Sequence, residues 1–429
     1  MSSAMGAGKR VGATFLGILS RTSLAASTHH RPSWFQLHGA GLAVRGGATL
    51  PSDTTELPGI FSGLQEIDPK LLTVERTADP KDKPAKETLV FGRTFTDHML
   101  KVDWDSRTGW HAPKITPYGD LKISPAASAL HYALECFEGM KAYRGVDGKV
   151  RLFRPDLNVQ RLNTSMSRLH FPPVDKEAMI ELISKLVLAD ADWIPEGMGY
   201  SLYIRPTAIS TYPYLGVGPA EEVQLYAILS PVGPYYKEGF NPIKLYADTE
   251  NVRAWPGGTG YTKTGGNYAP TILPQMQAMK DHGCAQILWL FGEDHLVTEV
   301  GAMNIFFLIE KEGGGKELIT SSLDTGDILP GVTRRCVLDL AHEWGEFDVS
   351  ERALPMREVA KAADEGRLLE VFGTGTAAVV SPVRAVSYMG RDIEVATGDT
   401  IGPIAKRVFD TLNSIYYGLV EHPWAVNIS

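Results

Sequence analysis

The chain has 429 residues, of which 44% are hydrophobic and 21% are charged, and its formal net charge is −8. This composition is typical of a globular protein with a sizeable core and about two or three domains. An acidic chain without a basic stripe is not expected to bind nucleic acid. No apolar run approaches the roughly 18 residues of a membrane helix, so we expect no membrane partner.

The three cysteines, Cys136, Cys284 and Cys336, are far apart and form no Cys-x-x-Cys pair. This pattern indicates neither a disulfide framework nor a zinc knuckle, and it fits a reducing compartment. No histidine has partner ligands at metal spacing, so no metal site is expected.

Residues 1–52 have a different composition from the rest. They contain no Asp or Glu, but they contain Lys9, four arginines and many Ser, Thr and Ala residues. This is typical of a mitochondrial transit peptide. The apolar stretch Val11–Leu19 also fits a secretory signal, and a disordered cytosolic tail is a third alternative. The repeated later arginines and the unpaired cysteines favour the mitochondrial matrix, with the cytoplasm as the alternative.

The first half of the remaining chain begins with a polar segment, 53–87, which we expect to be an extended arm. Strands are predicted at Val150–Phe153, Gly199–Ile209 and Val223–Val232, and the last is apolar enough to be buried on both faces. Lys176–Trp193 is predicted to be a helix ended by Pro195 and Gly197. Its apolar stripe consists of Met179, Leu182, Ile183, Leu186 and Val187.

Residues 231–242 are dense in Pro and Gly and are predicted to link an N-terminal domain, 53–230, to a C-terminal domain, 243–429. In the second half we expect strands at Ile243–Ala247, Ala285–Phe291 and Asn304–Ile309, and helices at Ala269–His282, Val332–Trp344 and Pro403–Tyr417. The mixture predicts two α+β domains with a ligand cleft between them.

The most informative segment is Trp255–Tyr268, in which Lys263 lies between two glycine clusters. Glycines allow a backbone to approach a ligand closely, and a lysine held away from bulk water is a nucleophilic amine. A nucleotide phosphate loop is one hypothesis and a Schiff-base lysine is the other. Thr262 replaces the glycine that a phosphate loop needs before its lysine, and Trp255-Pro256 is no buried strand. The Schiff-base hypothesis is therefore favoured.

A lysine that binds pyridoxal phosphate needs a carboxylate at the pyridine nitrogen, a donor to the phenolic oxygen and a phosphate pocket. Glu299 lies between two strand-like runs and is expected to be partly buried with a cationic partner. Thr333 begins a predicted helix, where amides and a hydroxyl face an anion. The small-residue segment Gly373–Ala377 is a second loop able to approach an anion.

The glycine-flanked lysine loop with Tyr268 resembles that of branched-chain amino-acid aminotransferases, which are fold-type IV pyridoxal enzymes. Glu299-x4-Asn304-x-Phe306 and Leu329-x-Gly331-Val332-x-Arg334 are similar to the signature of the whole class. The segments Phe91–His98, Phe137–Lys141 and Tyr203-x-Arg205-Pro206 are similar to the eukaryotic mitochondrial group. The resemblance runs from about residue 88 to the C-terminus.

The resemblance implies a fold-type IV architecture, with a smaller N-terminal domain, a larger C-terminal domain and pyridoxal 5'-phosphate between them. It implies a homodimer that exchanges the amino group of L-leucine, L-isoleucine or L-valine with 2-oxoglutarate, giving L-glutamate, by a ping-pong mechanism. Lys263 would form the Schiff base and move the proton. The implied cofactor-binding residues are Lys263, Tyr268, Glu299, Arg161, Val332, Thr333 and Thr376, and the implied substrate-binding residues are Phe91, Tyr132, Phe137, Tyr203, Arg205 and Ala377.

Several of these residues have an ordinary structural interpretation of their own. Arg161 lies in a segment that looks helical, Asn158–Arg168, where an exposed surface charge is equally expected. Phe91, Tyr132 and Phe137 alone would be core aromatics. Two rival functions remain: another fold-type IV activity, such as a D-amino-acid aminotransferase or an aminodeoxychorismate lyase, and a binding protein without cofactor.

Overall fold

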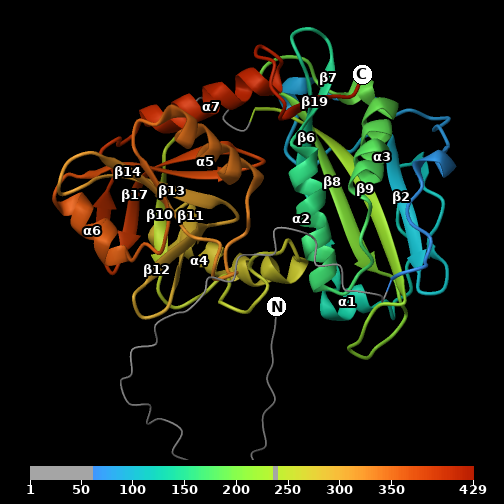
Figure 1. The fold of residues 1–429 in the computed structure, drawn as a ribbon, viewed down its shortest axis with the longest axis horizontal. Coiled ribbons are helices and arrows are strands. Elements are labelled where there is room, and N and C mark those ends of the chain that lie inside the picture. Colours follow the sequence, from blue (N-terminus) through green and yellow to red (C-terminus); the bar gives the residue numbers. More distant parts are fainter. Residues whose placement is uncertain (1–60, 235–239) are drawn as a thin grey trace, which may run out of the picture. The chain divides into compact units, whose positions relative to one another are not determined.

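The computed structural model describes residues 61–234 and 240–429, and all of them belong to one compact unit that begins at Ala48 (Figure 1). The predicted transit segment, 1–52, lies outside the described residues. Among the residues that are described, no helix is both long enough and apolar enough to cross a membrane.

The first half of the chain forms a ten-stranded sheet with the order β1-β4-β2-β9-β8-β6-β7-β19, to which β3 and β5 are attached at β2 and β8. Its strands are β1 (Thr73–Val74), β2 (His98–Asp105), β3 (Gly109–Trp110), β4 (Lys114–Pro117), β5 (Glu135–Phe137), β6 (Met140–Arg144), β7 (Val150–Phe153), β8 (Ser201–Ser210), β9 (Glu222–Val232) and β19 (Ala425–Asn427).

Two helices, α2 (Pro155–Arg168) and α3 (Lys176–Ala189), cover one face of this sheet (Figure 1). The predicted apolar stripe of α3 is fully buried. The Asp175 carboxylate caps the helix by accepting from the Ala178 N–H at 2.7 Å. The α-helix ends at Ala189, earlier than predicted, and Ala191–Trp193 form a separate 3-10 turn that buries the Trp193 ring.

Strand β9 corrects the prediction of a strand buried on both faces. Val223, Leu225, Ala227 and Leu229 enter the core, whereas the residues between them are only half-buried. This alternation arises because the first sheet has helices on one face only along this part of β9. The predicted linker is also shorter than expected at its start, since Pro231 and Val232 are the last residues of β9 and pair with β8.

The second half of the chain forms a nine-stranded sheet with the order β12-β11-β10-β17-β16-β13-β14-β15, to which β18 is attached at β17. Its strands are β10 (Ile243–Asp248), β11 (Gln286–Phe291), β12 (Leu296–Val300), β13 (Asn304–Glu310), β14 (Lys316–Thr320), β15 (Asp348–Glu351), β16 (Leu368–Gly375), β17 (Val379–Tyr388) and β18 (Arg391–Glu394).

Helices bury apolar residues against both faces of the second sheet. On one side, α5 (Val332–Trp344) and α7 (Pro403–Tyr416) pack against a core that includes Phe306 and Phe372. On the other, α6 (Met356–Asp364) packs against a core that includes Leu288 and Phe307. The remaining helices of the described chain are α1 (Ser128–Tyr132) and α4 (Ile272–His282), with 3-10 turns at Pro69–Leu71, Lys86–Thr88, Gly265–Asn267 and Ala269–Thr271.

The two sheets share contacts and chain segments. Tyr143 and Phe153 of the first sheet pack on Tyr416 of α7, with ring centroids 4.5 and 4.6 Å apart. Ala425–Asn427, which fall within the predicted C-terminal domain, instead pair with β7 of the first sheet as β19. The functional residues described next come from both sheets.

Candidate active site

The lysine loop lies between β10 and α4 and is held in one conformation by its own polar groups. The Asn267 side-chain amide donates to the Thr259 and Thr262 carbonyls at 2.8 and 2.9 Å. Gly260 is required by packing, because a Cβ there would lie 2.4 Å from the Asp327 carbonyl oxygen. A short 3-10 turn, not an α-helix, follows Lys263, which further separates this loop from a nucleotide phosphate loop.

The first sheet and its helix also hold this loop. The Phe137 N–H donates to the Lys263 carbonyl at 3.0 Å, and the Lys263 N–H donates to Ser165 Oγ of α2 at 2.8 Å. Cys136 and Thr264 form an isolated β-bridge beside them. The backbone of Lys263 is therefore fixed by residues that lie far away in the sequence.

The Lys263 side chain is half-buried and directed at an aromatic hydroxyl. Its Nζ atom lies 3.0 Å from the Tyr268 hydroxyl oxygen and 4.9 Å from the centre of the Phe137 ring. The amine is thus oriented by one hydrogen bond and flanked by two rings. This geometry presents a nucleophilic amine beside a hydroxyl donor, as the sequence predicted.

Glu299 is 2% exposed and lies in β12, a strand of its own and not a connection between strands. Its Oε1 atom accepts from the Asn304 side-chain amide at 3.0 Å and from the Leu329 N–H at 3.1 Å. Its Oε2 atom is 2.7 Å from Arg253 Nε in a buried ion pair. Burial raises the pKa of Glu299, and Arg253 opposes that rise.

The Glu299 Oε2 atom is buried and has no hydrogen-bond partner of suitable geometry among the described residues. A buried acceptor without a donor is costly, so a donor from a ligand is expected at this atom. The N–H of a protonated pyridine ring is such a donor. The residues present therefore fit pyridoxal phosphate, with Lys263 and Tyr268 on one side and Glu299 on the other.

Arg161 of α2 is buried, not a surface charge. Its Nε and Nη2 atoms donate to both carboxylate oxygens of Glu138 at 2.7 and 2.9 Å, and Nη1 donates to the Pro330 carbonyl at 3.1 Å. Burial alone would raise the pKa of Glu138, but the Arg161 guanidinium holds it below the usual value. The arginine is thereby fixed beside the start of α5.

The start of α5 offers free amides for an anion. Gly331 is the N-cap residue, and no side chain caps the helix. The first N–H groups, those of Val332 and Thr333 included, have no partner within the helix and carry the positive end of its dipole. Val332, Thr333 and Thr376 line one small cavity, so three of the predicted phosphate contacts are brought together.

Four of the predicted substrate-binding residues form an aromatic cluster around one cation. The Arg205 guanidinium lies 4.6 Å from the Phe137 ring centre and 5.2 Å from that of Tyr203, whose hydroxyl accepts from Arg205 Nη2 at 2.9 Å. Phe91 packs edge-on against Tyr203 at 4.8 Å. Ala377 follows Thr376 in the loop between β16 and β17.

Tyr132 is not part of this cluster. It ends α1, is 42% exposed, and its hydroxyl donates to the backbone carbonyl of Leu215. Ala133 follows in the left-handed conformation, with φ of 51°, and turns the chain away from the helix. Among the described residues, no ring contact joins Tyr132 to Phe91, Phe137 or Tyr203.

The sequence analysis missed several polar residues that hold the site in place. Arg253 was not named, although a cationic partner was expected for Glu299. Glu138 and Asn158, which donates to Glu138 at 2.8 Å, were within quoted segments but had no assigned role. These contacts join residues far apart in the chain, and no local spacing marks them.

Residues 135–386 match the family model described as amino-transferase class IV. The chain is 52% identical to a branched-chain-amino-acid aminotransferase of Monosiga brevicollis, over 84% of this chain and 93% of that protein. It is 50% identical to the cytosolic enzyme of Mus musculus and 48% identical to the mitochondrial enzyme of Rattus norvegicus, over 81% and 83% of this chain and 90% and 91% of those proteins.

Solved structures agree with these relatives. The branched-chain amino acid aminotransferase of Escherichia coli superposes with a TM-score of 0.63 at 25% identity, covering 78% of this chain and 99% of that one. A second bacterial-type structure, the T.th. enzyme solved with pyridoxamine 5'-phosphate, gives a TM-score of 0.60 at 26% identity, over 76% and 98% of the two chains. Fold and site thus define a class IV aminotransferase of the pyridoxal phosphate type. The chain belongs, within that class, to the branched-chain-amino-acid aminotransferase family.

Proposed function

We propose that this protein transfers the amino group between L-leucine, L-isoleucine or L-valine and 2-oxoglutarate, with Lys263 as the catalytic residue. The observation that carries the proposal is the half-buried Lys263 amine, which lies 3.0 Å from the Tyr268 hydroxyl in a loop fixed by both sheets. Pyridoxal phosphate, when bound, supplies an electron sink for the negative charge that develops at the substrate α-carbon.

The remaining cofactor contacts follow from the polar groups of the site. Glu299, kept ionised by Arg253, accepts from the pyridine N–H and so holds a proton on that nitrogen. Tyr268 donates to the phenolic oxygen and also orients the Lys263 amine. Arg161, the amides of Val332 and Thr333, and the Thr376 hydroxyl hold the phosphate at the start of α5.

The proposed substrate pocket has to accept a branched apolar side chain in one half-reaction and a γ-carboxylate in the other. Phe91, Phe137 and Tyr203 provide apolar walls, while the Arg205 guanidinium lies between two of the rings. Arg205 Nε is buried without a hydrogen-bond partner among the described residues, so a donor remains for a substrate carboxylate. We place Ala377 at the α-carboxylate, through the amides of its loop.

The first test removes the Lys263 amine. We expect the wild-type protein to be yellow and active, and Lys263→Ala to lose both its colour and at least about 10⁴-fold in turnover, since nucleophile and proton carrier disappear together. Lys114→Ala, which removes an exposed lysine of β4, is the matched control and should behave as wild type. A colourless wild type that binds no cofactor would refute the proposal.

A parallel assay separates this activity from other chemistry on the same fold. L-leucine, D-alanine and aminodeoxychorismate are each offered to the wild-type protein under identical conditions. Turnover of L-leucine with 2-oxoglutarate, and none of the other two, is the expected result. Preferential turnover of either alternative substrate would assign the chain to a different reaction.

We also propose that the protein is a homodimer. Helix α4 exposes Ile272, Leu273, Met276 and Met279, each at least 57% exposed, and their spacing places them on one helical face. An exposed apolar face of this kind is typical of a protein interface. Tyr132 lies on the surface beside Leu215, which is 63% exposed, so in this proposal it completes the pocket of the partner subunit.

Finally, we propose that residues 1–52 direct the protein to the mitochondrial matrix. Their basic, acid-free composition supports this, and a mitochondrial relative from Rattus norvegicus is as similar as several cytosolic ones. A fluorescent protein fused after residue 52 should enter mitochondria, whereas one fused to residues 53–429 should stay in the cytoplasm. Cytoplasmic fluorescence of the first fusion would favour the alternative location.

A further inference from the structure

Lys141 is a buried lysine to which neither the sequence motifs nor the proposed mechanism assigns a role. It lies in β6, pairs with Tyr203 of β8 across the sheet, and is 8% exposed. Its neighbours Met140 and Ala142 face the core beneath α2 and α3, whereas Tyr143, on the same side of the strand as Lys141, packs toward α7. The lysine therefore faces the cofactor side of the sheet.

A single hydrogen bond satisfies this buried ammonium. Lys141 Nζ donates to the Ala377 carbonyl oxygen at 2.9 Å. No carboxylate lies within 4 Å of Nζ among the described residues. An ammonium has three N–H donors, so two are left for another acceptor. Burial lowers the pKa of Lys141 to about 8, which shows how poorly the protein alone compensates this charge.

The position of Lys141 suggests which acceptor it serves. It lines the same small cavity as Asn158, Val332, Thr333 and Thr376. These include the uncapped start of α5 and the proposed hydroxyl ligands of the phosphate. A cavity with free helix amides, two hydroxyls and a buried cation is complementary to a phosphate dianion.

The charge balance of the cavity points the same way. Arg161, the other cation nearby, forms a two-pronged ion pair with Glu138, whose carboxylate offsets most of its charge. That pair leaves the cavity close to neutral, although a phosphate carries about two negative charges. Lys141 is then the cation in the described cavity wall whose charge is not cancelled by a protein carboxylate.

We infer that Lys141 provides the uncompensated positive charge of the phosphate site, and that its bond to the Ala377 carbonyl fixes the loop that carries Thr376. This inference rests on the proposed function, because it assumes that the cavity at the start of α5 holds the cofactor's phosphate. Arg161 has a complementary part: it is held rigidly by Glu138 and supplies directed N–H groups. The two cations differ in that only Lys141 lacks an anionic partner.

The inference is tested by titrating cofactor-free full-length protein with pyridoxal 5'-phosphate and, separately, with pyridoxal, which lacks the phosphate. Lys141→Met removes the charge and keeps the length of the side chain. We expect it to weaken binding of pyridoxal 5'-phosphate by about 10- to 100-fold, as for loss of a hydrogen bond to a charged group. Binding of pyridoxal should change by less than about threefold. Lys149→Met, at the exposed lysine of the next turn, is the control.

Each outcome of this titration decides the question. Equal weakening of both ligands would mean that Lys141 only maintains the fold of the loop, and unchanged binding of both would mean that the cation is irrelevant; either result overturns the inference. If Lys141→Met does not fold, Lys141→Gln carries the same comparison. Failure of the proposed function would be recognised separately, because the wild type itself would then not bind pyridoxal 5'-phosphate.

Discussion

Glu299 and Arg253 form a buried ion pair in which both side chains are 2% exposed. Burying two charges costs several kcal/mol, and their attraction offsets that cost only when both are present. The pair therefore contributes little to folding as a whole. Its consequence is that the carboxylate stays ionised in a place where burial alone favours the neutral acid.

The first residue-scale prediction concerns Arg253→Met. Burial places the folded-state pKa of Glu299 above its ordinary value of 4.5, so between these two pKa values the folded state binds more protons and stability falls as pH rises. Removing Arg253 raises the folded pKa further and widens that window. Urea unfolding of cofactor-free protein should show a loss of about 3–5 kcal/mol at pH 8 and a smaller loss at pH 5.

Two further variants test the cause. The double variant Arg253→Met/Glu299→Gln should lose the extra pH dependence, because no charge is left unpaired. Arg357→Met, which breaks an exposed ion pair with Asp294, should change stability little. A loss for Arg253→Met that is the same at both pH values would indicate packing and not the carboxylate as its origin.

The second residue-scale prediction concerns Lys141 in the absence of cofactor. Its pKa of about 8 lies below the ordinary value of 10.5, so below pH 8 the folded protein carries the cost of a buried charge, and this cost disappears as pH rises toward 10.5. Cofactor-free Lys141→Met should therefore be more stable than wild type at pH 7, by about 1–3 kcal/mol. With cofactor bound, the order of stabilities should reverse.

Thermal unfolding with and without pyridoxal 5'-phosphate measures both orders of stability. A variant that is less stable than wild type under both conditions would show that Lys141 serves folding and not binding.

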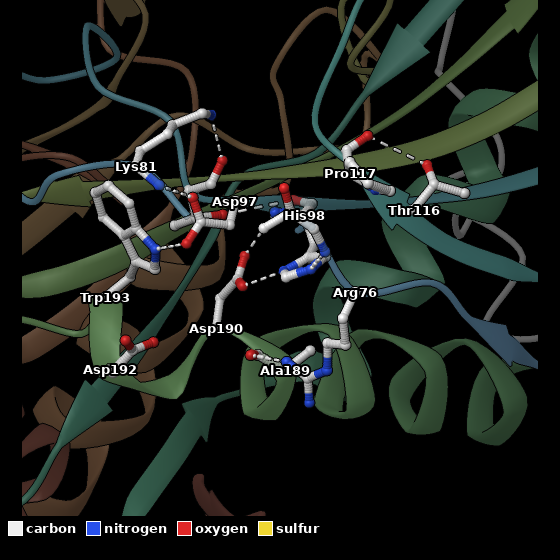
Figure 2. Close-up of polar contacts among 12 residues, drawn as sticks. Arg76, Lys81, Asp97, His98, Thr116, Pro117, Ala189, Asp190, Asp192 and Trp193 are labelled. Atoms are coloured by element: carbon white, nitrogen blue, oxygen red, sulfur yellow. Dashed lines mark hydrogen bonds and ion pairs between the residues drawn. The ribbon is translucent and has the colours of Figure 1, made fainter. Parts of the chain in front are cut away.

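At the scale of elements, the segment before β2 is held to the first sheet by a compact set of hydrogen bonds (Figure 2). The Lys81 N–H donates to Asp97 Oδ1 at 2.9 Å, and Trp193 Nε1 donates to Asp97 Oδ2 at 2.8 Å. The Thr77 N–H donates to His98 Nε2 at 3.0 Å, so the proton of the ring lies on Nδ1, 2.6 Å from Asp190. The predicted extended arm is thus anchored from residue 77 to residue 81.

This arrangement predicts the effect of Asp97→Ala. Loss of the carboxylate leaves the buried Trp193 N–H without its partner, and we expect a destabilisation of about 1–3 kcal/mol. Hydrogen exchange at residues 76–83 should accelerate more than exchange in β8 or β9. Asp192→Ala removes the largely exposed partner of Lys83 and serves as the control. Equal exchange in both variants would show that Asp97 does not hold the arm.

Elements with a strong local pattern were predictable from sequence. The bounds predicted for α5 are confirmed, and so is the buried stripe of α3, because periodic burial is written into consecutive residues. Strand β12 was missed, since its pairing with β11 depends on residues outside its own segment. The early end of α3 was likewise set by the burial of Trp193 against Asp97, a long-range contact.

The candidate site was predictable to the same extent. Lys263 and Tyr268 are five residues apart, and their spacing in one loop suggested the contact that the structure contains. The pairing of Arg253 with Glu299 joins two segments with no sequence relation. Tyr132 was placed in the pocket by resemblance alone, and its exposed position beside Leu215 depends on the turn at Ala133.

At the scale of the whole molecule, the proposed dimer predicts the effect of charges on α4. Ile272→Lys/Met276→Lys places two ammonium groups on the exposed apolar face of the helix, where a partner would have to desolvate them. Sedimentation should show a dimer for wild type and a monomer for this variant, with reduced activity because Tyr132 then serves no partner.

Val146→Lys, at an exposed apolar residue of the β6–β7 turn, is the control and should remain dimeric. A wild-type chain that sediments as a monomer would refute the proposed dimer, and a variant that remains dimeric would move the interface away from α4.

The pairing of β19 with β7 has a consequence for synthesis of the chain. The outer edge of β7 has its hydrogen-bonding groups ready as soon as the first sheet forms, but their partners are Ala425–Asn427. Throughout translation of the second sheet, that edge is an open template for other nascent strands. We therefore expect chains cut before residue 425 to aggregate on the ribosome or after release, even though every residue of the active site is already made.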